Sequence, residues 1–205
     1  TGVTIDYDGV SRGDSPKMGA YENNLYTWQG TLSNSFATAG NWVGGEVPPD
    51  GADIVFASNP VNPCVLDQNR SLKNITNAQG DDDLVLNGHQ LGITGNLDFT
   101  NGAQIDATAA ASVVAFAGSA VQNMPAGAFV SSTLGGLTLN NANGLALSES
   151  LVISTALTLS SGAMVIGANT LTVNGAIMAP SGTLSGGSSS NLIIGGSGGK
   201  TCLPG

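Results

Sequence analysis

The chain has 205 residues with 41% hydrophobic, 5% aromatic and 9% charged side chains, 30 glycines and a formal net charge of −9 at pH 7. Five Lys and Arg against 14 Asp and Glu leave no basic surface to neutralise phosphates, so we expect no nucleic-acid partner. No apolar run reaches membrane-spanning length, and we expect no membrane insertion.

The first segment, residues 1–26, combines a short predicted strand with a charged turn. It resembles the closing segment of secreted bacterial right-handed parallel β-helix proteins, with Lys17 where that family usually has an acid. The residues that carry the resemblance are Asp6, Asp8, Gly9, Arg12, Gly19, Ala20, Tyr21 and Glu22. The resemblance implies that this segment closes a preceding β-helix domain, so that Thr1 lies inside a larger protein.

Residues 27–53 form the next segment, which holds the aromatic side chains Trp28, Phe36 and Trp42 ahead of the main run of strands. A protein made of stacked coils has an open end with unpaired backbone groups, and an aromatic cluster at that point predicts a cap. The alternative is that Trp28 and Trp42 bind a glycan, because indoles also stack on sugars. We prefer the capping role.

The same segment also carries a pattern of T-W-x-G, then N-W, then V-P and an acid. It resembles the start of repeats in secreted and cell-surface proteins of Bacteroidetes-type bacteria, with Phe36 where another Trp is common. The matching residues are Thr27, Trp28, Gly30, Asn41, Trp42, Gly44, Val47, Pro48 and Asp53. The resemblance extends over most of residues 27–200 through Leu-Thr-Leu rungs, and it implies an extracellular or cell-surface location.

Short apolar alternations follow, separated by Asn, Gly and Pro turns, and each predicts a strand with one buried face. They lie at residues 54–56, 64–66, 72–75, 84–86, 91–93 and 97–99, and continue through Ile105, Val113, Val121 and Phe129. The alanine-rich run at residues 107–120 favours helix by composition. We nevertheless predict packed coil there, because Val and Gly interrupt the run and strand spacing flanks it.

From residue 137 onward the apolar positions return about every 20 residues, as Leu137, Leu157 and Ile177 show. Triplets this short suit the sides of a coil better than hairpins. We therefore predict an all-β fold, a three-sided parallel β-solenoid over residues 54–205 with about 20 residues per coil, continuing beyond the C-terminus. Leu137, Leu157 and Ile177 should stack on one inner side. The resemblance favours a right-handed coil, although spacing alone does not fix the hand.

The sharpest charged feature is the run Asp81, Asp82 and Asp83. Adjacent carboxylates repel one another, and a hard cation such as calcium would relieve the repulsion. The alternative is a solvated acidic loop. We expect no other cofactor.

The residues suited to catalysis are sparse. His89 is the only histidine, no metal-protease or phosphate-binding motif is present, and after Asp106 the only acid is Glu149. We predict that the chain is not an enzyme. Cys64 opens an apolar triplet and should be a buried side chain, whereas Cys202 is expected to pair outside the chain if it pairs at all.

From these observations we predict that the chain is a structural stalk or adhesin module, which forms a stiff rod within a large secreted or cell-surface bacterial protein. Its expected partners are other segments of the same large chain or a surface assembly such as a filament, with glycans as a further candidate. The alternative is a carbohydrate-binding or carbohydrate-cleaving parallel β-helix.

Overall fold

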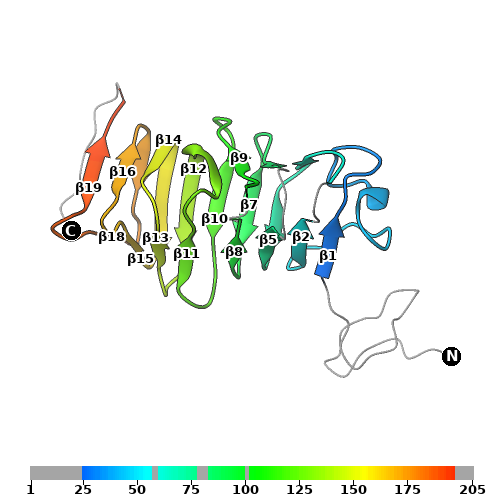
Figure 1. Cartoon of the computed structure of the whole chain (residues 1–205). Coiled ribbons are helices and arrows are strands. Elements are labelled where there is room, and N and C mark those ends of the chain that lie inside the picture. Colours follow the sequence, from blue (N-terminus) through cyan, green and yellow to red (C-terminus); the bar gives the residue numbers. More distant parts are fainter. Residues whose placement is uncertain (1–24, 57–59, 78–82, 100–101, 197–205) are drawn as a thin grey trace.

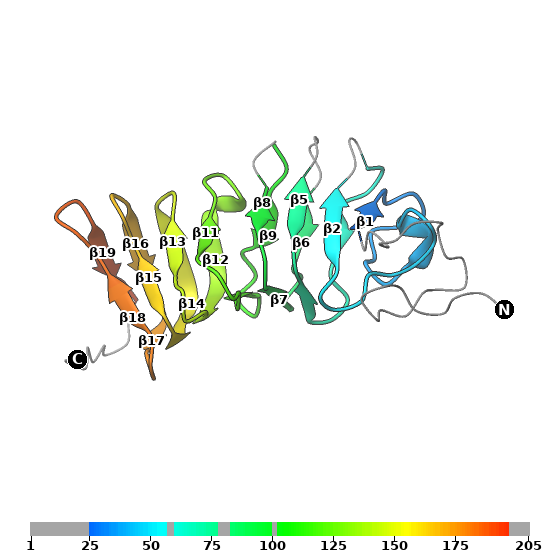
Figure 2. The same ribbon diagram turned by 90° about the horizontal axis from the view of Figure 1, so that it is seen from below.

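The computed structural model describes residues 25–56, 60–77, 83–99 and 102–196. They form an all-β parallel β-solenoid of about 6 turns, with successive turns about 21 residues apart, which confirms the predicted fold class. The strands succeed one another along a single axis from β1 to β19 (Figures 1 and 2). The expected closing segment lies almost wholly outside the described residues, as do Asp81, Asp82 and Cys202.

Each coil has three sides, and every strand pair between coils is parallel. The first side contains β3 (Cys64–Val65), β6 (Leu84–Val85), β9 (Ile105–Ala107), the first part of β12 (Phe129–Asn140), the first part of β14 (Leu151–Ser161), β16 (Thr170–Val173) and β19 (Asn191–Ile194). The second side contains β4 (Arg70–Leu72), β7 (Gln90–Ile93), β10 (Val113–Phe116), the later parts of β12 and β14, and β17 (Ala176–Met178).

The third side is divided into two sheets. The first sheet contains β1 (Leu25–Trp28), β2 (Asp53–Phe56), β5 (Ile75–Asn77) and β8 (Leu97–Asp98). The second contains β11 (Gln122–Met124), β13 (Leu145–Leu147), β15 (Ala163–Val165) and β18 (Thr183–Ser185). A short 3-10 turn, η1 (Ala39–Asn41), lies between β1 and β2.

The predicted stacking of apolar side chains is confirmed. Leu137 pairs with Leu157 and Leu157 pairs with Ile177 in the parallel register. Leu137 and Leu157 are buried, and Ile177 is half-buried and packs against the core. Because alternate residues of a strand point to opposite faces, this register builds one continuous apolar column along the second side.

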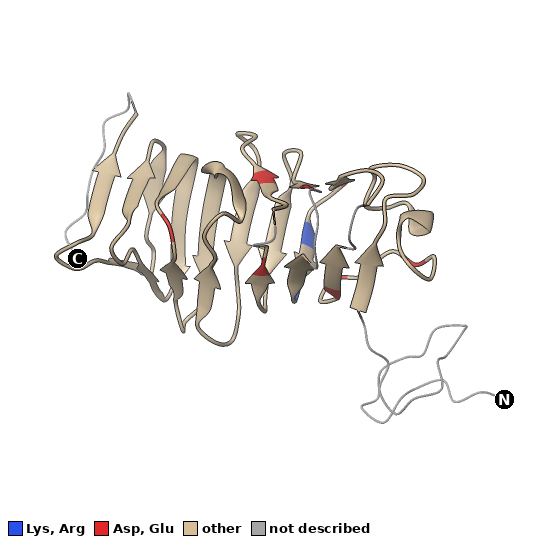
Figure 3. Cartoon of the chain, viewed as in Figure 1, with Lys and Arg blue, Asp and Glu red and all other residues tan. Residues whose placement is uncertain are grey.

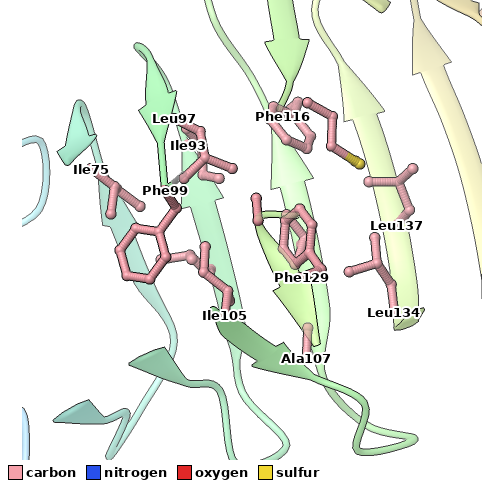
Figure 4. Close-up of a cluster of buried hydrophobic side chains, with 14 of the residues drawn as sticks. Ile75, Ile93, Leu97, Phe99, Ile105, Ala107, Phe116, Phe129, Leu134 and Leu137 are labelled. Carbon is pink, nitrogen blue, oxygen red and sulfur yellow. The ribbon is translucent and has the colours of Figure 1, made fainter. Parts of the chain in front are cut away.

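The core fills the space between the three sides. Figure 4 shows Phe99, Ile105 and Phe129 pointing inward from neighbouring coils, and all three side chains are fully buried. Phe56 and Phe99 also meet edge to face with ring centroids 5.2 Å apart, although Asn77 pairs directly with Phe56 in the register. The smaller Asn77 thus leaves room for aromatic contact between coils that are not adjacent.

The local boundaries differ from the predicted ones in several places. Residues 72–75 are not one strand but the end of β4 and the start of β5, on two different sides. Val121 is exposed, and the neighbouring Gln122 points inward instead. The β12 and β14 strands each continue through a corner, because no Pro or Asn turn separates their two apolar triplets. The alanine-rich run contains β10 and no α-helix, as predicted.

Candidate functional site

The aromatic cluster at the N-terminal end of the solenoid is a compact three-ring stack. The Trp42 ring lies between the other two, with its centroid 5.0 Å from that of Trp28 and 4.8 Å from that of Phe36, both edge to face. Both indole nitrogens donate hydrogen bonds, Trp28 Nε1 to the Asn62 carbonyl at 3.0 Å and Trp42 Nε1 to the Phe36 carbonyl at 2.8 Å. The rings are therefore held in fixed orientations.

The two tryptophan side chains are buried, with Trp28 0% and Trp42 2% exposed. A sugar-stacking platform needs an open ring face, and neither indole offers one in this arrangement. Burial is the arrangement that the capping interpretation expects. Glycan binding by Trp28 and Trp42 stays a prediction that requires a binding measurement.

The loop around the cluster is organised by Asn41, which is completely buried. Its Oδ1 accepts hydrogen bonds from the backbone N–H groups of Leu32 at 2.9 Å and Ser33 at 3.0 Å. Its Nδ2 donates to Ser33 Oγ and to the Ser35 carbonyl, both at 3.0 Å. A buried amide with all four partners fixes the loop in one shape.

All three strand edges at this end receive a backbone partner from the capping segment. On the third side β1 pairs in parallel with β2. On the first side the Phe36 N–H donates to the Val65 carbonyl at 3.0 Å, and the Val65 N–H donates to the Asn34 carbonyl at 2.7 Å. β1 is itself covered by the loop that follows it, because Trp28 and Trp42 form an antiparallel bridge and the Val43 N–H donates to the Thr27 carbonyl at 2.9 Å. The edges are thus closed on both of these sides.

On the second side, residues 50–52 cover β4. The Gly51 N–H donates to the Ser71 carbonyl at 2.7 Å, and the Lys73 N–H donates to the Ala52 carbonyl at 2.9 Å. Asp50 Oδ1 accepts from the Ser71 N–H at 2.9 Å. The cap is therefore more than the aromatic cluster. Residues 50–52 lie within the predicted capping segment of residues 27–53, but their backbone contact with β4 was not predicted.

Arg70 joins the cap to the first coil. It pairs in register with the buried Leu91, so it occupies the last inward position of the apolar column. Its guanidinium carbon lies 4.4 Å from the centroid of the Phe36 ring, a cation–π contact, and its Nη2 is 2.8 Å from Asp67 Oδ1. An inward charge at this position was not predicted, because sequence gives no signal for which residue ends the column.

Cys64 is fully buried below this junction, as expected. Burial raises the pKa of the Cys64 thiol well above its ordinary value. The charge of Arg70 lowers this pKa and the charge of Asp67 raises it, each by less than burial does. A protonated buried thiol is a poor nucleophile, so Cys64 acts as a small apolar side chain.

Of the predicted calcium ligands, only Asp83 lies within the described residues. Its Oδ1 accepts a hydrogen bond from the Gln104 N–H of the next coil at 3.1 Å, and its carbonyl accepts one from the Cys64 N–H at 3.0 Å. Among the described residues no group of three or more His, Cys, Asp or Glu is placed to hold a metal ion. Calcium at Asp81, Asp82 and Asp83 stays a prediction.

The other acids of the described residues are dispersed along the solenoid (Figure 3). Asp98 lies on β8 of the third side and Asp106 on β9 of the first side, where its Oδ1 accepts hydrogen bonds from the Thr108 N–H at 3.0 Å and the Thr108 hydroxyl at 2.6 Å. His89 is half-buried after the turn formed by Asn87 and Gly88, both with positive φ. The structure thus places these groups on separate elements.

Comparison of the chain with known proteins finds no matching family model, no matching curated protein and no matching solved structure. Among the described residues, no helix is long and apolar enough to cross a membrane.

Proposed function

We propose that the chain is a structural rod module, a stalk or adhesin segment, of a large secreted or cell-surface bacterial protein. The observation that carries the proposal is the continuous parallel pairing from the capped end at β1 to β19 on three sides. Each coil contacts its neighbours through backbone hydrogen bonds and buried side chains, so a load applied along the chain is resisted by every coil interface.

The proposed location is supported by the T-W-x-G and N-W pattern. Trp28, Asn41 and Trp42 of this pattern are all buried within the cap. The residues that resemble those of secreted bacterial repeat proteins are thus the residues that build the start of the solenoid here. This agreement supports a shared structural role for the pattern in proteins of that kind.

The proposed partners are other segments of the same large chain or of a surface assembly. After Asp106 the described part of the solenoid carries a single charged side chain, Glu149. Its outer surface there consists mainly of small and hydroxyl-bearing residues, which suits close contact with neighbouring uncharged polypeptide. We therefore propose that these contacts are made within a large secreted or cell-surface bacterial protein.

Single-molecule force spectroscopy with the chain held at its two ends tests the mechanical role. A solenoid coil of about 21 residues should release roughly 70 Å of chain, at about 3.3–3.6 Å per residue. We expect unfolding events whose lengths are multiples of this value. Extension without resolvable force peaks would contradict a structural role.

Antibodies against the described part of the chain test the location. Intact producing cells, or their secreted fraction, should be labelled as strongly as permeabilised cells. Labelling that appears only after permeabilisation would contradict a surface or secreted protein.

A further inference from the structure

The backbone pairing between coils is weakest at one level in the middle of the solenoid. There the coil that contains β8, β9 and β10 meets the coil that contains β11 and β12, and we call this interface the joint (Figures 1 and 2). On the third side, no backbone pairing joins β8 to β11 in the described part of the chain. All other neighbouring strands of that side are paired in a regular parallel register.

The first side is irregular at the same joint. β9 pairs with β12 at two positions, Ile105 with Phe129 and Ala107 with Leu134, and the register shifts between them. Within this shift residues 131–132 both have positive φ, a backbone conformation that a strand ladder does not accommodate. One coil earlier, β6 and β9 keep a single register.

Only the second side is regular across the joint. There β10 pairs with β12 at four consecutive positions, from Val113 opposite Gly136 to Phe116 opposite Leu139. The Gly136 N–H also donates to the Ser112 carbonyl at 2.8 Å, directly before the first of these pairs. A parallel ladder holds its strands roughly 4.8 Å apart, so the second side fixes the spacing of the two coils.

Side-chain amides bridge the joint on the other two sides. On the third side, Gln122 Nε2 donates to the carbonyls of Ile93 at 2.9 Å and Gly95 at 2.8 Å. On the first side, Gln104 Nε2 donates to the Phe129 carbonyl at 3.3 Å. A ladder fixes every residue of both strands, whereas a side chain holds its partner at one point. Gln122 is buried and therefore keeps the third side closed without making it continuous.

The apolar contact across the joint is also reduced on the first side. Ala107 points inward there, and it pairs with the buried Leu134 of the next coil (Figure 4). One coil earlier, the equivalent inward position is Leu86, because Val85 pairs with Asp106. A methyl side chain makes fewer dispersion contacts with the facing coil than the larger leucine side chain does. Separating the two coils on this side therefore breaks fewer contacts than at the previous interface.

We propose that the joint is a latched hinge of the solenoid. The coils before it and after it bend about the β10–β12 ladder and open along the first and third sides, and Gln122 is the latch that holds them closed. The hinge adds one bending point to the proposed rod, and it does not rest on that function. A rod with such a hinge yields to a sideways load at one defined level.

Site-resolved native-state hydrogen exchange of the parent chain tests the hinge without any substitution. The Ile105 N–H donates across the joint to the Ala128 carbonyl at 2.7 Å, and the Leu84 N–H makes the equivalent bond to the Gln104 carbonyl at 3.1 Å. After correction for intrinsic rates, the Ile105 amide should exchange at least about tenfold faster than the Leu84 amide, because the joint opens at a lower free energy. The Gly136 amide, which crosses the joint on the second side, should remain as protected as that of Leu84.

A reference beyond the joint separates the hinge from a gradual loss of protection with distance from the cap. The Gln122 N–H donates to the Gly144 carbonyl at 3.1 Å, one interface further along the solenoid. Its amide should also exchange more slowly than that of Ile105. Protection of Ile105 equal to that of Leu84, or a Gly136 amide as fast as that of Ile105, would overturn the hinge.

Distances between pairs of spin labels measure the bend itself, in a Cys202→Ser background whose remaining cysteine is buried. One pair replaces Val55 and Val165 on the third side, and the other replaces Ser71 and Met178 on the second side. The pairs extend from β2 to β15 and from β4 to β17, so both span the joint and the same number of coils. The third-side distances should be distributed at least about twice as widely as the second-side distances.

Gln122→Ala should release the latch, and it should move the third-side distances to larger values while the second-side distances stay unchanged. Asn123→Ala, on the exposed face of the same strand, is the matched control and should change neither. Equal widths on the two sides of the parent chain would overturn the hinge whether or not the Gln122→Ala variant folds. Equal widening of both sides in that variant would also overturn it, because the coils would then loosen without a fixed side.

Discussion

At the scale of single residues, the cap depends on a few side chains whose geometry leaves little freedom. Trp42 contacts both other rings, donates to the Phe36 carbonyl and is 2% exposed. Removing its ring would leave a cavity next to Trp28 and would expose the first coil. The free energy of unfolding should therefore be sensitive to this position.

Trp42→Ala should lower the free energy of unfolding by about 3–5 kcal/mol, the range for removing a buried aromatic side chain. The adjacent Val43 is 50% exposed, and Val43→Ala should change the stability by less than about 0.5 kcal/mol. Urea denaturation of both variants makes the comparison. A stable Trp42→Ala variant that had lost binding to a glycan would instead favour the sugar-binding alternative.

The buried thiol gives a pH dependence with a definite sign. Burial raises the pKa of Cys64, so the folded chain keeps this proton at pH values where the unfolded chain, with a thiol pKa of about 8.5, releases it. This contribution to stability is constant well below pH 8.5 and is lost progressively above it. The slope approaches about 1.4 kcal/mol per pH unit.

Urea unfolding between pH 7 and pH 9.5, in a Cys202→Ser background, measures this effect. The decline should be present in that background and absent when Cys64→Ala is added. Equal slopes in the two proteins would show that another group is responsible.

The calcium prediction concerns Asp81, Asp82 and Asp83. If they bind the ion, millimolar calcium should raise the melting temperature relative to EDTA, and Asp82→Asn should abolish the shift. Asp50→Asn, which changes an acid on the capping segment instead, should leave the shift in place. No shift in the parent chain would contradict the site.

At the scale of elements, the third side is interrupted, because no backbone pairing joins β8 of its first sheet to β11 of its second sheet. The buried Gln122 spans this break: Nε2 donates to the carbonyls of Ile93 at 2.9 Å and Gly95 at 2.8 Å. Its Oε1 accepts from the Gly118 N–H at 2.8 Å and from Asn141 Nδ2 at 2.9 Å. These side-chain hydrogen bonds link β11 to the end of β7 and to the turn that precedes β8, where no backbone ladder joins β8 and β11.

Gln122→Ala should lower the free energy of unfolding by at least about 2 kcal/mol, because each buried group left unsatisfied costs about 1–3 kcal/mol. Asn123→Ala, on the exposed face of the same strand, serves as the control and should have little effect. Equal, small effects for both variants would mean that the break is held together by other contacts.

Sequence predicted the coils well where the period is regular. Leu137, Leu157 and Ile177 are separated by 20 residues each time, and they stack as predicted. It failed where the period changes. Ile105 pairs with Phe129, 24 residues on, whereas Ala107 pairs with Leu134, 27 residues on, because the register shifts between Phe129 and Leu134 at Ser131 and Ser132, both with positive φ. Insertions at corners leave the alternation intact and so give no signal.

The candidate site was predictable in its aromatic part only. Trp28, Phe36 and Trp42 are large apolar residues close together in sequence, and large apolar side chains are usually buried. The contribution of Arg70 depends on register with Leu91 and on the position of Phe36. The pairing of Arg70 with Leu91 and its contact with Phe36 join residues far apart in the sequence, and the order of residues alone does not predict such contacts.

At the scale of the whole molecule, the solenoid is asymmetric. Its cap satisfies backbone groups on all three sides at one end, whereas at the other end no strand among the described residues pairs with β17, β18 or β19 from beyond, and Leu192 is 42% exposed. Because stability in such folds is close to a sum over neighbouring coils, coils at an open end should open more readily than coils beneath a cap.

Site-resolved native-state hydrogen exchange of the 205-residue chain tests this account most directly. The amides of Phe36 and Val65, which join the cap to the first coil, should exchange at least about 100-fold more slowly than those of Leu192 and Ile194 in the last described coil. Cap amides that exchange as fast as those of Leu192 and Ile194 would contradict a solenoid whose capped end is more stable than its last described coil.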